Sequence, residues 1–388
     1  MRRRRKVALV CAGGGITGAV YEIGCLRALE ELLERSVMDL DLYVGVSGGA
    51  FVTSLLANGI SPAEMYDEVT SRGPRPFGLS SAPIFRLGIS EFLKRSVRAP
   101  RVLSQAVLAS LSEEGRNLAD LGLALFELLP AGLLETSGIQ QYLAQLFAQR
   151  GTDSFTRLAR ELYIVAVDLD RGDAVAFGEP GRRQVPISKA VEASIALPGL
   201  YRPVRIGGRD YVDGGVKKTA HINLAIQHGA DLVICINPIV PLRNRAAHSP
   251  LGGHLSNKGV TYVLDQALRI MLHGRMEYGL ERYRAEHPEV DILLLQPTPH
   301  DLRMFSYNIM RYSARRIVAA HGYRSVVSHF RRHRARHARV LARHGIDLAA
   351  PSRNGDLPEP LPYRSPVGRT LAGSLDRLRS KLRRSGVA

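Results

Sequence analysis

A serine flanked by glycines is the strongest chemical signal in the sequence. Residues 45–49 have the sequence GVSGG, which matches the G-x-S-x-G pattern around Ser47. A strand predicted over residues 42–46 leads into the serine, and a helix predicted from residue 48 leads out of it. This sharp turn exposes a nucleophilic hydroxyl beside a helix N-terminus, whose positive partial charge favours a developing oxyanion. Without that context the pattern would indicate only a glycine-rich turn.

A glycine-rich loop follows the first predicted strand, residues 7–12. Residues 13–18 have the sequence GGGITG, and residues without side chains leave backbone N–H groups open to an oxyanion or a phosphate. The spacing also fits the G-x-G-x-x-G pattern of dinucleotide-binding folds, which need an acidic residue at the end of the second strand. Asp39 and Asp41 lie at about that distance, but they precede the second strand. The loop is therefore interpreted as an oxyanion hole for Ser47.

A third candidate element is the sequence YVDGG at residues 211–215. Asp213 stands at the end of a predicted strand, where α/β folds place functional groups. Taken alone, an Asp-Gly pair indicates a turn more often than a catalytic site. The segment ASIALP at residues 193–198 lies just upstream and is predicted to be a helix that ends at Pro198. Both interpretations of Asp213 stay open at this point.

Histidines offer two competing sites. In a Ser-His-Asp triad the base would be a histidine after Ser47. The candidates are His221, His228 and His254. None has a recognisable loop context, and His221 is predicted to lie on the surface at a helix start.

Three further histidines are spaced four residues apart and would share one helical face. They are His329, His333 and His337. Arginines surround them and would repel a cation, whereas a metal site needs carboxylate or thiolate neighbours. We therefore expect a solvated basic face here and no metal ion.

The positive charge of the chain is concentrated at its two ends. The 388 residues carry 53 Lys and Arg against 36 Asp and Glu, a net charge of +17. Residues 1–6 hold five of these basic side chains, and residues 311–388 hold 18 against four acids, so residues 7–310 are near neutral at −2. This distribution excludes a uniformly basic protein that coats nucleic acid, and it predicts local contact with a polyanionic surface.

The cysteines and the hydropathy pattern bear on the compartment. Cys11, Cys25 and Cys235 are too few for a disulfide framework, and each lies in an apolar segment, so they are predicted to be buried reduced thiols of a cytoplasmic protein. No run of 18 apolar residues is present, and no transmembrane helix is expected. The apolar run after the basic N-terminus is too short for a signal peptide.

Alternating strand and helix patterns define the fold class and the domains. The predicted strands are residues 7–12, 42–46, 162–169, 174–177, 210–212, 232–237 and 292–296. Helices fill the gaps, which indicates an α/β layered domain over residues 6–300. Within it, residues 91–149 are predicted to be a helical insertion that could serve as a lid. The rest is predicted to be a basic helical extension (301–350), a Pro-rich linker (351–366) and a basic amphipathic helix (367–388).

In this order, the four motifs resemble those of the patatin-like phospholipase family, which includes the catalytic domain of cytosolic phospholipase A2. That family has a glycine-rich loop after strand one, G-x-S-x-G about 30 residues later, an A-S-x-A-x-P segment, and then D-G-G or D-G-A. The corresponding positions here are residues 13–18, 45–49, 193–198 and 213–215. The resemblance covers roughly residues 6–300 and implies a three-layer α/β/α fold with a mostly parallel central sheet.

The resemblance also implies a role for each candidate residue. Ser47 is the implied nucleophile and Asp213 the implied general base of a Ser-Asp dyad, which needs neither a metal nor a cofactor. The backbone N–H groups of three consecutive glycines form the implied oxyanion hole: Gly13, Gly14 and Gly15. The glycines that support the motifs are Gly18, Gly45, Gly48, Gly49, Gly214 and Gly215.

The implied activity is that of a lipid acyl hydrolase, of phospholipase A or lysophospholipase type, that cleaves fatty-acyl esters at a membrane surface. The family usually has Lys or Arg where this chain has Thr17, which keeps a neutral-lipid hydrolase or a transacylase as alternatives. A catalytically silent lipid- or protein-binding module on the same fold is the alternative from another class. The basic, leucine-striped last helix predicts peripheral contact with an anionic membrane or lipid surface in preference to nucleic acid. Its leucines are Leu371, Leu375, Leu378 and Leu382.

Overall fold

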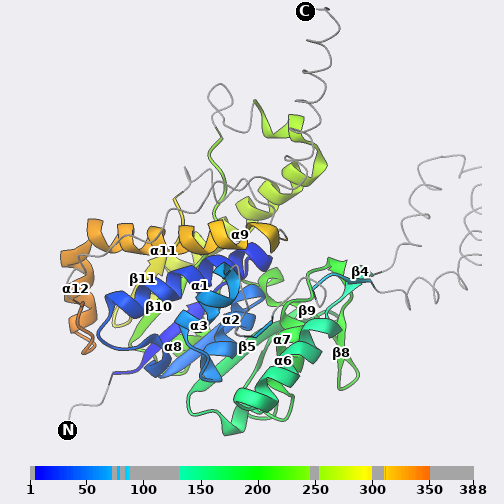
Figure 1. Cartoon of the computed structure of the whole chain (residues 1–388), viewed down its shortest axis with the longest axis horizontal. Helices are drawn as coiled ribbons and strands as arrows, with labels where there is room; N and C mark the ends of the chain where they lie inside the picture. Colours follow the sequence, from blue (N-terminus) through cyan, green and yellow to red (C-terminus); the bar gives the residue numbers. More distant parts are fainter. Residues whose placement is uncertain are drawn as a thin grey trace, which may run out of the picture. The chain divides into compact units, whose positions relative to one another are not determined.

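The computed structural model describes residues 5–71, 77–78, 84–87, 131–244, 253–298, 310 and 312–349 (Figure 1). The predicted insertion lies outside the described residues up to residue 130, and so do the predicted linker and last helix.

A central sheet of eight strands organises the chain. Its strands are β1 (Val7–Cys11), β2 (Leu42–Val46), β5 (Glu161–Asp168), β6 (Asp173–Phe177), β8 (Val204–Ile206), β9 (Arg209–Asp213), β10 (Leu232–Ile236) and β11 (Asp291–Leu295). The order is β11-β10-β1-β2-β5-β9-β8, with β6 also paired to β5. The pairings from β11 to β5 are all parallel, whereas β6 and β9 run antiparallel to β5. The predicted α/β class with a mostly parallel sheet is confirmed.

Helices cover both faces of this sheet, as parallel strands require. On one face, α8 (Ile222–Gln227) and α9 (Val260–Glu286) pack on alternate residues of β1 and β2. On the other face lie α1 (Gly15–Leu32), α2 (Gly48–Ala57) and α3 (Pro62–Thr70) (Figure 1). Strands β1, β2 and β10 are buried at every position, so their continuous apolar runs follow from two covered faces.

A small second sheet corrects the prediction that residues 91–149 hold no strand. It consists of β3 (Arg86–Leu87), β4 (Gly132–Glu135) and β7 (Gly199–Tyr201), in the order β3-β4-β7. Helices α6 (Ser137–Arg150) and α7 (Ile187–Ser194) pack against each other nearby. Strands this short are stabilised by pairing with distant segments, and local sequence carries little signal for them. The short 3₁₀ turns are η1 (Val37–Asp39), η2 (Phe155–Arg157), η3 (Gly214–Val216), η5 (Leu255–Lys258) and η6 (Tyr312–Ala314).

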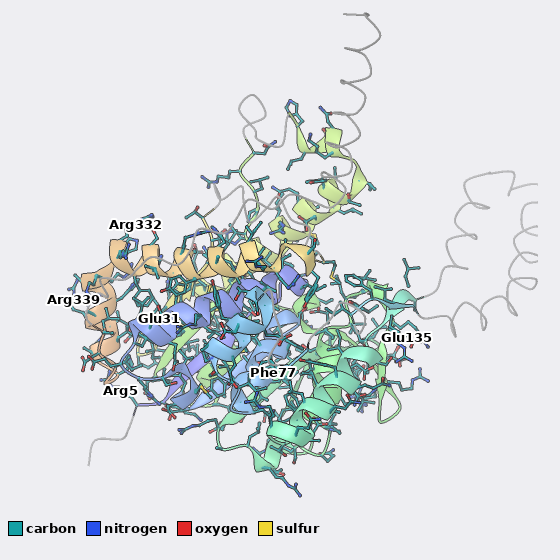
Figure 2. The ribbon with its side chains drawn as sticks, in the orientation of Figure 1. Arg5, Glu31, Phe77, Glu135, Arg332 and Arg339 are labelled. Atoms are coloured by element: carbon teal, nitrogen blue, oxygen red, sulfur yellow. The ribbon has the colours of Figure 1, made fainter. Side chains whose placement is uncertain are left out.

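The basic helices after residue 310 are α11 (Arg315–Arg332) and α12 (Arg334–Ala342), and the break between them lies at His333. Helix α11 packs along α1, where glycines allow the two backbones to touch (Figure 1). A Cβ on Gly24 or on Gly322 would collide with backbone of the opposite helix. Arg332 at the end of α11 and Arg339 on α12 are both exposed (Figure 2).

Two compositional predictions can be compared with the structure. All three cysteines are free and buried, as predicted. Among the described helices, none has the length and apolar character needed to cross a bilayer.

Candidate active site

Ser47 occupies a strained turn between β2 and α2. Its backbone has φ 53° and ψ −123°, and among the described residues it is the only non-glycine residue with positive φ. Such a conformation costs about 1–3 kcal/mol and persists only where the surroundings enforce it. Helix α2 begins directly afterwards at Gly48, where a Cβ would lie 2.5 Å from the Gly15 carbonyl oxygen. The glycines around Ser47 are therefore required by close backbone packing.

A buried serine holds this turn in place. The Ser47 backbone N–H donates to the Ser194 Oγ atom at 2.9 Å, and the Ser194 hydroxyl donates to the Val165 carbonyl at 2.6 Å. Ser194 is the serine of the ASIALP segment, at the end of α7. The sequence identified this segment as a motif but did not indicate its structural role. Ser194 holds the turn between β2 and α2 against strand β5.

Asp213 reaches Ser47 through the strand register. Val46 of β2 pairs with Val165 of β5, and the adjacent Ala166 pairs with Asp213 of β9. The Ser47 and Asp213 side chains line the same cavity, close enough for the Ser47 hydroxyl to favour the charged form of the carboxylate, and the Gly215 N–H donates to Asp213 Oδ1 at 2.7 Å. The two residues whose motifs are 166 positions apart are thus neighbours.

The environment of Asp213 makes its carboxylate a stronger base. The side chain is buried, and burial raises the pKa of Asp213 to about 6, although the Ser47 hydroxyl and the hydrogen bond from Gly215 oppose that shift. Desolvation penalises the charged form, so a proton is held more tightly than by an exposed carboxylate. A carboxyl group with this pKa is ionised at neutral pH and is still a useful proton acceptor.

The glycine loop lies beside the serine, with one of its amides already engaged. The Gly13 N–H donates to the Thr219 carbonyl at 3.0 Å, so it is committed within the loop. Gly14 and Gly15 follow at the start of α1, where the first amides of a helix have no intrahelical acceptor. A Cβ on Gly13 would lie 3.3 Å from the Ser47 Cβ atom, which places the loop against the serine. Of the three predicted oxyanion donors, Gly14 and Gly15 are the better placed.

A cavity of about 160 Å³ brings these elements together. Ser47, Asp213 and the loop residues 13–15 all line it, together with apolar side chains from several helices. These side chains include Val20, Ile23, Phe51, Ile139, Leu268 and Leu272. The combination of one polar corner and apolar walls fits a molecule with an ester group and a hydrocarbon chain.

Most of the other predicted glycines shape the backbone and lie outside the cavity wall. Gly48 and Gly215 line the cavity; the four that do not are Gly18, Gly45, Gly49 and Gly214. A Cβ on Gly49 or on Gly214 would overlap the carbonyl of Cys11 or Val165, respectively. These residues let the strand ends and turns approach each other closely.

None of the three triad histidines lines the cavity formed by the described residues. His221 precedes α8 as predicted, but it is buried instead of exposed, and burial lowers the pKa of His221 to about 4 although the Gly214 backbone opposes that shift. His228 stacks on Tyr163 and contacts Glu179 at 2.7 Å. His221 therefore supports the turn after Asp213 as a neutral side chain.

The histidine cluster of α11 and α12 is also different from the prediction. The rings of His329 and His337 stack with centroids 4.9 Å apart, and His337 is buried against Phe330. His337 therefore departs from the expected solvated face, whereas His333 and most of the surrounding arginines are exposed as expected. Within the described ranges, no group of three or more His, Cys, Asp or Glu side chains is arranged to hold a metal ion.

Comparison with known proteins places these observations in a family. The sequence model described as patatin-like phospholipase matches residues 9–226, more than half of the chain. Two relatives, uncharacterized NTE family proteins of Mycobacterium bovis and Mycobacterium tuberculosis, are each 25% identical over 235 residues, or 60% of this chain and 30% of the relative. The chain thus spans about 30% of the length of these relatives. Among solved structures, VipD from Legionella pneumophila aligns over 84% of this chain and 66% of its own, with 16% identity and a TM-score of 0.38.

Proposed function

The chain belongs to the patatin-like phospholipase family, and on that premise we propose that it is a serine lipid acyl hydrolase that cleaves fatty-acyl esters at a membrane surface. The observation that carries the proposal is the juxtaposition of Ser47 and Asp213 at the polar end of an apolar cavity. A strained serine, a buried carboxylate with a raised pKa and a helix N-terminus are the parts that acyl transfer requires.

In the proposed reaction, the Ser47 hydroxyl attacks the ester carbonyl while Asp213 accepts its proton. The tetrahedral oxyanion is held by backbone N–H groups of Gly14 and Gly15 and by the positive end of α1. Collapse of this intermediate transfers the proton from Asp213 to the leaving alcohol and leaves an acyl group on Ser47. A water molecule, deprotonated by Asp213, then attacks the acyl-enzyme; as the bond between the acyl group and Ser47 Oγ breaks, Asp213 returns the proton to Ser47 and the fatty acid is released. No step needs a metal or a cofactor.

The apolar side chains of the cavity favour a fatty-acyl chain as the part of the substrate that is bound. Thr17 is buried and uncharged at the position where the family pattern has Lys or Arg, so the glycine loop offers no cation to a phosphate head group. The proposal therefore covers fatty-acyl esters of phospholipids and neutral lipids alike. The basic C-terminal segments are proposed to hold the enzyme peripherally on an anionic membrane.

Two substitutions test the proposed dyad. Ser47→Ala is expected to reduce hydrolysis of p-nitrophenyl butyrate to background, because the nucleophile is lost. Asp213→Asn removes the proton acceptor but keeps the size of the side chain, and the expected loss in kcat is about 10²–10⁴-fold. Ser54→Ala is the matched control: this serine lies on α2, donates to the Phe51 carbonyl at 2.7 Å and does not itself line the cavity.

A fluorophosphonate probe separates the enzyme from a silent binding module. Wild type and Ser54→Ala are expected to be labelled at Ser47, whereas Ser47→Ala is not. Folded wild-type protein that resists labelling and hydrolyses no ester would support the binding module. Full activity in Asp213→Asn together with loss of activity in His221→Gln would replace the dyad by a triad.

A further inference from the structure

Helix α9 presents large apolar side chains to solvent. Most of the exposed large hydrophobic residues in the described part of the chain belong to this helix. Val260, Leu264, Met271 and Tyr278 are spaced by four, seven and seven residues, so they lie along one face of the helix. The same face has Ala267 and Gly274 between them; none of these six residues is charged, and the charged side chains that adjoin them toward Val216 and the helix end are the cations Arg275 and Arg282. We refer to residues 260, 264, 267, 271, 274 and 278 as the α9 stripe.

This stripe runs beside the cavity that contains Ser47. Leu268 and Leu272 of α9 line the cavity, and Leu264 and Met271 lie next to that face of the helix on the solvent side. Val216 extends the apolar surface: it lines the cavity, is 42% exposed, and its carbonyl accepts a hydrogen bond from Arg275 of α9 at 2.6 Å. The cavity wall therefore reaches the surface next to the stripe, three residues after Asp213.

We infer that the α9 stripe, together with Val216, is the surface that inserts into the lipid aggregate and brings the cavity against the acyl chains. The inference rests on the proposed function. A fatty-acyl chain that moves from a bilayer into the cavity avoids exposure to water only if the two apolar regions are continuous. An uncharged helical face that borders the cavity provides that continuity, and such a face lies in the interface plane of a bilayer.

The chemistry of α9 distinguishes this face from its neighbour. Val263 and Ile270 are also exposed and also seven residues apart, but their face continues into Glu277 and Glu281. Carboxylates would be repelled by an anionic lipid surface and are costly to bury in a bilayer. By helical spacing the acidic face flanks the stripe on the side away from Leu268, Leu272 and Arg275, so of the two faces only the stripe combines an apolar surface with a position next to the cavity.

A matched pair of double variants tests this assignment. Leu264→Ser with Met271→Ser alters the stripe, where the two side chains are 63% and 57% exposed. Val263→Ser with Ile270→Ser alters the adjacent face, where they are 46% and 54% exposed. Each pair shares the spacing, the helix and the substitution, and none of the four residues lines the cavity.

Binding is measured by sedimentation with phosphatidylcholine–phosphatidylglycerol vesicles in the Ser47→Ala background, at 0.5 M NaCl to screen the basic segments. The stripe variant is expected to bind at least tenfold more weakly than its parent, and the control variant within twofold of it. With Ser47 restored, the stripe variant should lose vesicle phospholipid hydrolysis to a similar extent and keep kcat on p-nitrophenyl butyrate. That retained turnover also shows that the variant is folded.

Equal vesicle binding by the two double variants would overturn the inference. So would a stripe variant that dissociates from dimer to monomer in sedimentation equilibrium while its vesicle binding is unchanged, because the stripe would then be a contact between two copies of the chain. A wild type that hydrolyses no ester but whose vesicle binding depends on the stripe would refute the proposed function and leave the docking surface intact.

Discussion

Asp213 must be ionised to accept a proton, yet its carboxyl group is buried beside Ser47. Burial raises its pKa to about 6, and a carboxylate accepts a proton only in its deprotonated form. The ionised fraction therefore falls tenfold for each pH unit below about 6. We expect kcat/KM for p-nitrophenyl butyrate to rise with pH through a midpoint near 6 and to level off above pH 7. A pH–rate profile of the free enzyme measures this limb.

The same profile distinguishes the two possible bases. Burial lowers the pKa of His221 to about 4, so a His221 base would place the ascending limb near pH 4. A limb at that pH would contradict the assignment of Asp213. The pH–rate profile of Ser54→Ala, measured in parallel, is expected to have the same midpoint as that of the wild type.

At the residue scale, the sequence identified residues that lie in local motifs, but it did not identify roles that depend on tertiary hydrogen bonds. The turns that carry Ser47 and Asp213 could be predicted because glycines mark them, whereas the role of Asp213 as a base is implied only by the resemblance. The role of Ser194 could not be predicted, since it depends on a hydrogen bond to a residue 147 positions away. The hydrogen bond from the Gly13 N–H to the Thr219 carbonyl could not be predicted either, because it is also a contact between residues far apart in the sequence. For that reason the Gly13 amide was counted, from the sequence, among the oxyanion donors.

At the element scale, α7 is expected to set the geometry of the turn that carries Ser47. Ser194→Ala removes the acceptor for the Ser47 N–H and leaves that donor buried, which costs about 1–3 kcal/mol. The strained turn should relax, so we expect kcat to fall about tenfold with KM little changed. Steady-state kinetics with p-nitrophenyl butyrate and thermal unfolding measure the two effects.

Ser188→Ala is the matched control, because Ser188 is a fully buried serine on the same helix whose hydroxyl donates to Asp153 Oδ2 at 2.7 Å. It should lose stability without a change in kcat. A Ser194→Ala variant that loses only stability, as the control does, would limit Ser194 to a structural role.

The elements that sequence predicted well are those with strong local patterns. Strand β2 has its predicted bounds, and the other six predicted strands agree within two residues at either end. Strands β3, β4 and β7 have two to four residues and form only because distant segments pair with them. Strand β8 is also short, and it pairs with β9 in a local hairpin across Gly207 and Gly208. Helix α11 was predicted from its own arginine-rich pattern, but its packing on α1 depends on Gly24 and Gly322, which look like helix breakers in isolation.

At the scale of the whole molecule, the positive charge of the C-terminal region is divided between two segments of the chain. Of the net +14 in residues 311–388, +9 belongs to residues 311–351, which include α11 and α12, and +5 belongs to residues 352–388. The chain separates into compact units at this point, with residues 1–351 in one and 352–388 in the other. Net charge alone could not show that most of this cationic surface is carried by helices packed on the α/β body.

Deletion of residues 352–388 tests whether the second unit adds electrostatic attraction to membranes. Each Lys or Arg near an anionic leaflet contributes about 1 kcal/mol, so the loss of a net +5 should weaken binding to phosphatidylglycerol-containing vesicles at least tenfold at 0.1 M NaCl. The difference should vanish at 0.5 M NaCl or on phosphatidylcholine vesicles, because it depends on opposite charges. Hydrolysis of p-nitrophenyl butyrate should be unchanged, since Ser47 and Asp213 lie in the first unit. Retention of double-stranded DNA at physiological salt that is stronger than vesicle binding, and lost in the deletion, would instead identify the unit as a nucleic-acid-binding segment.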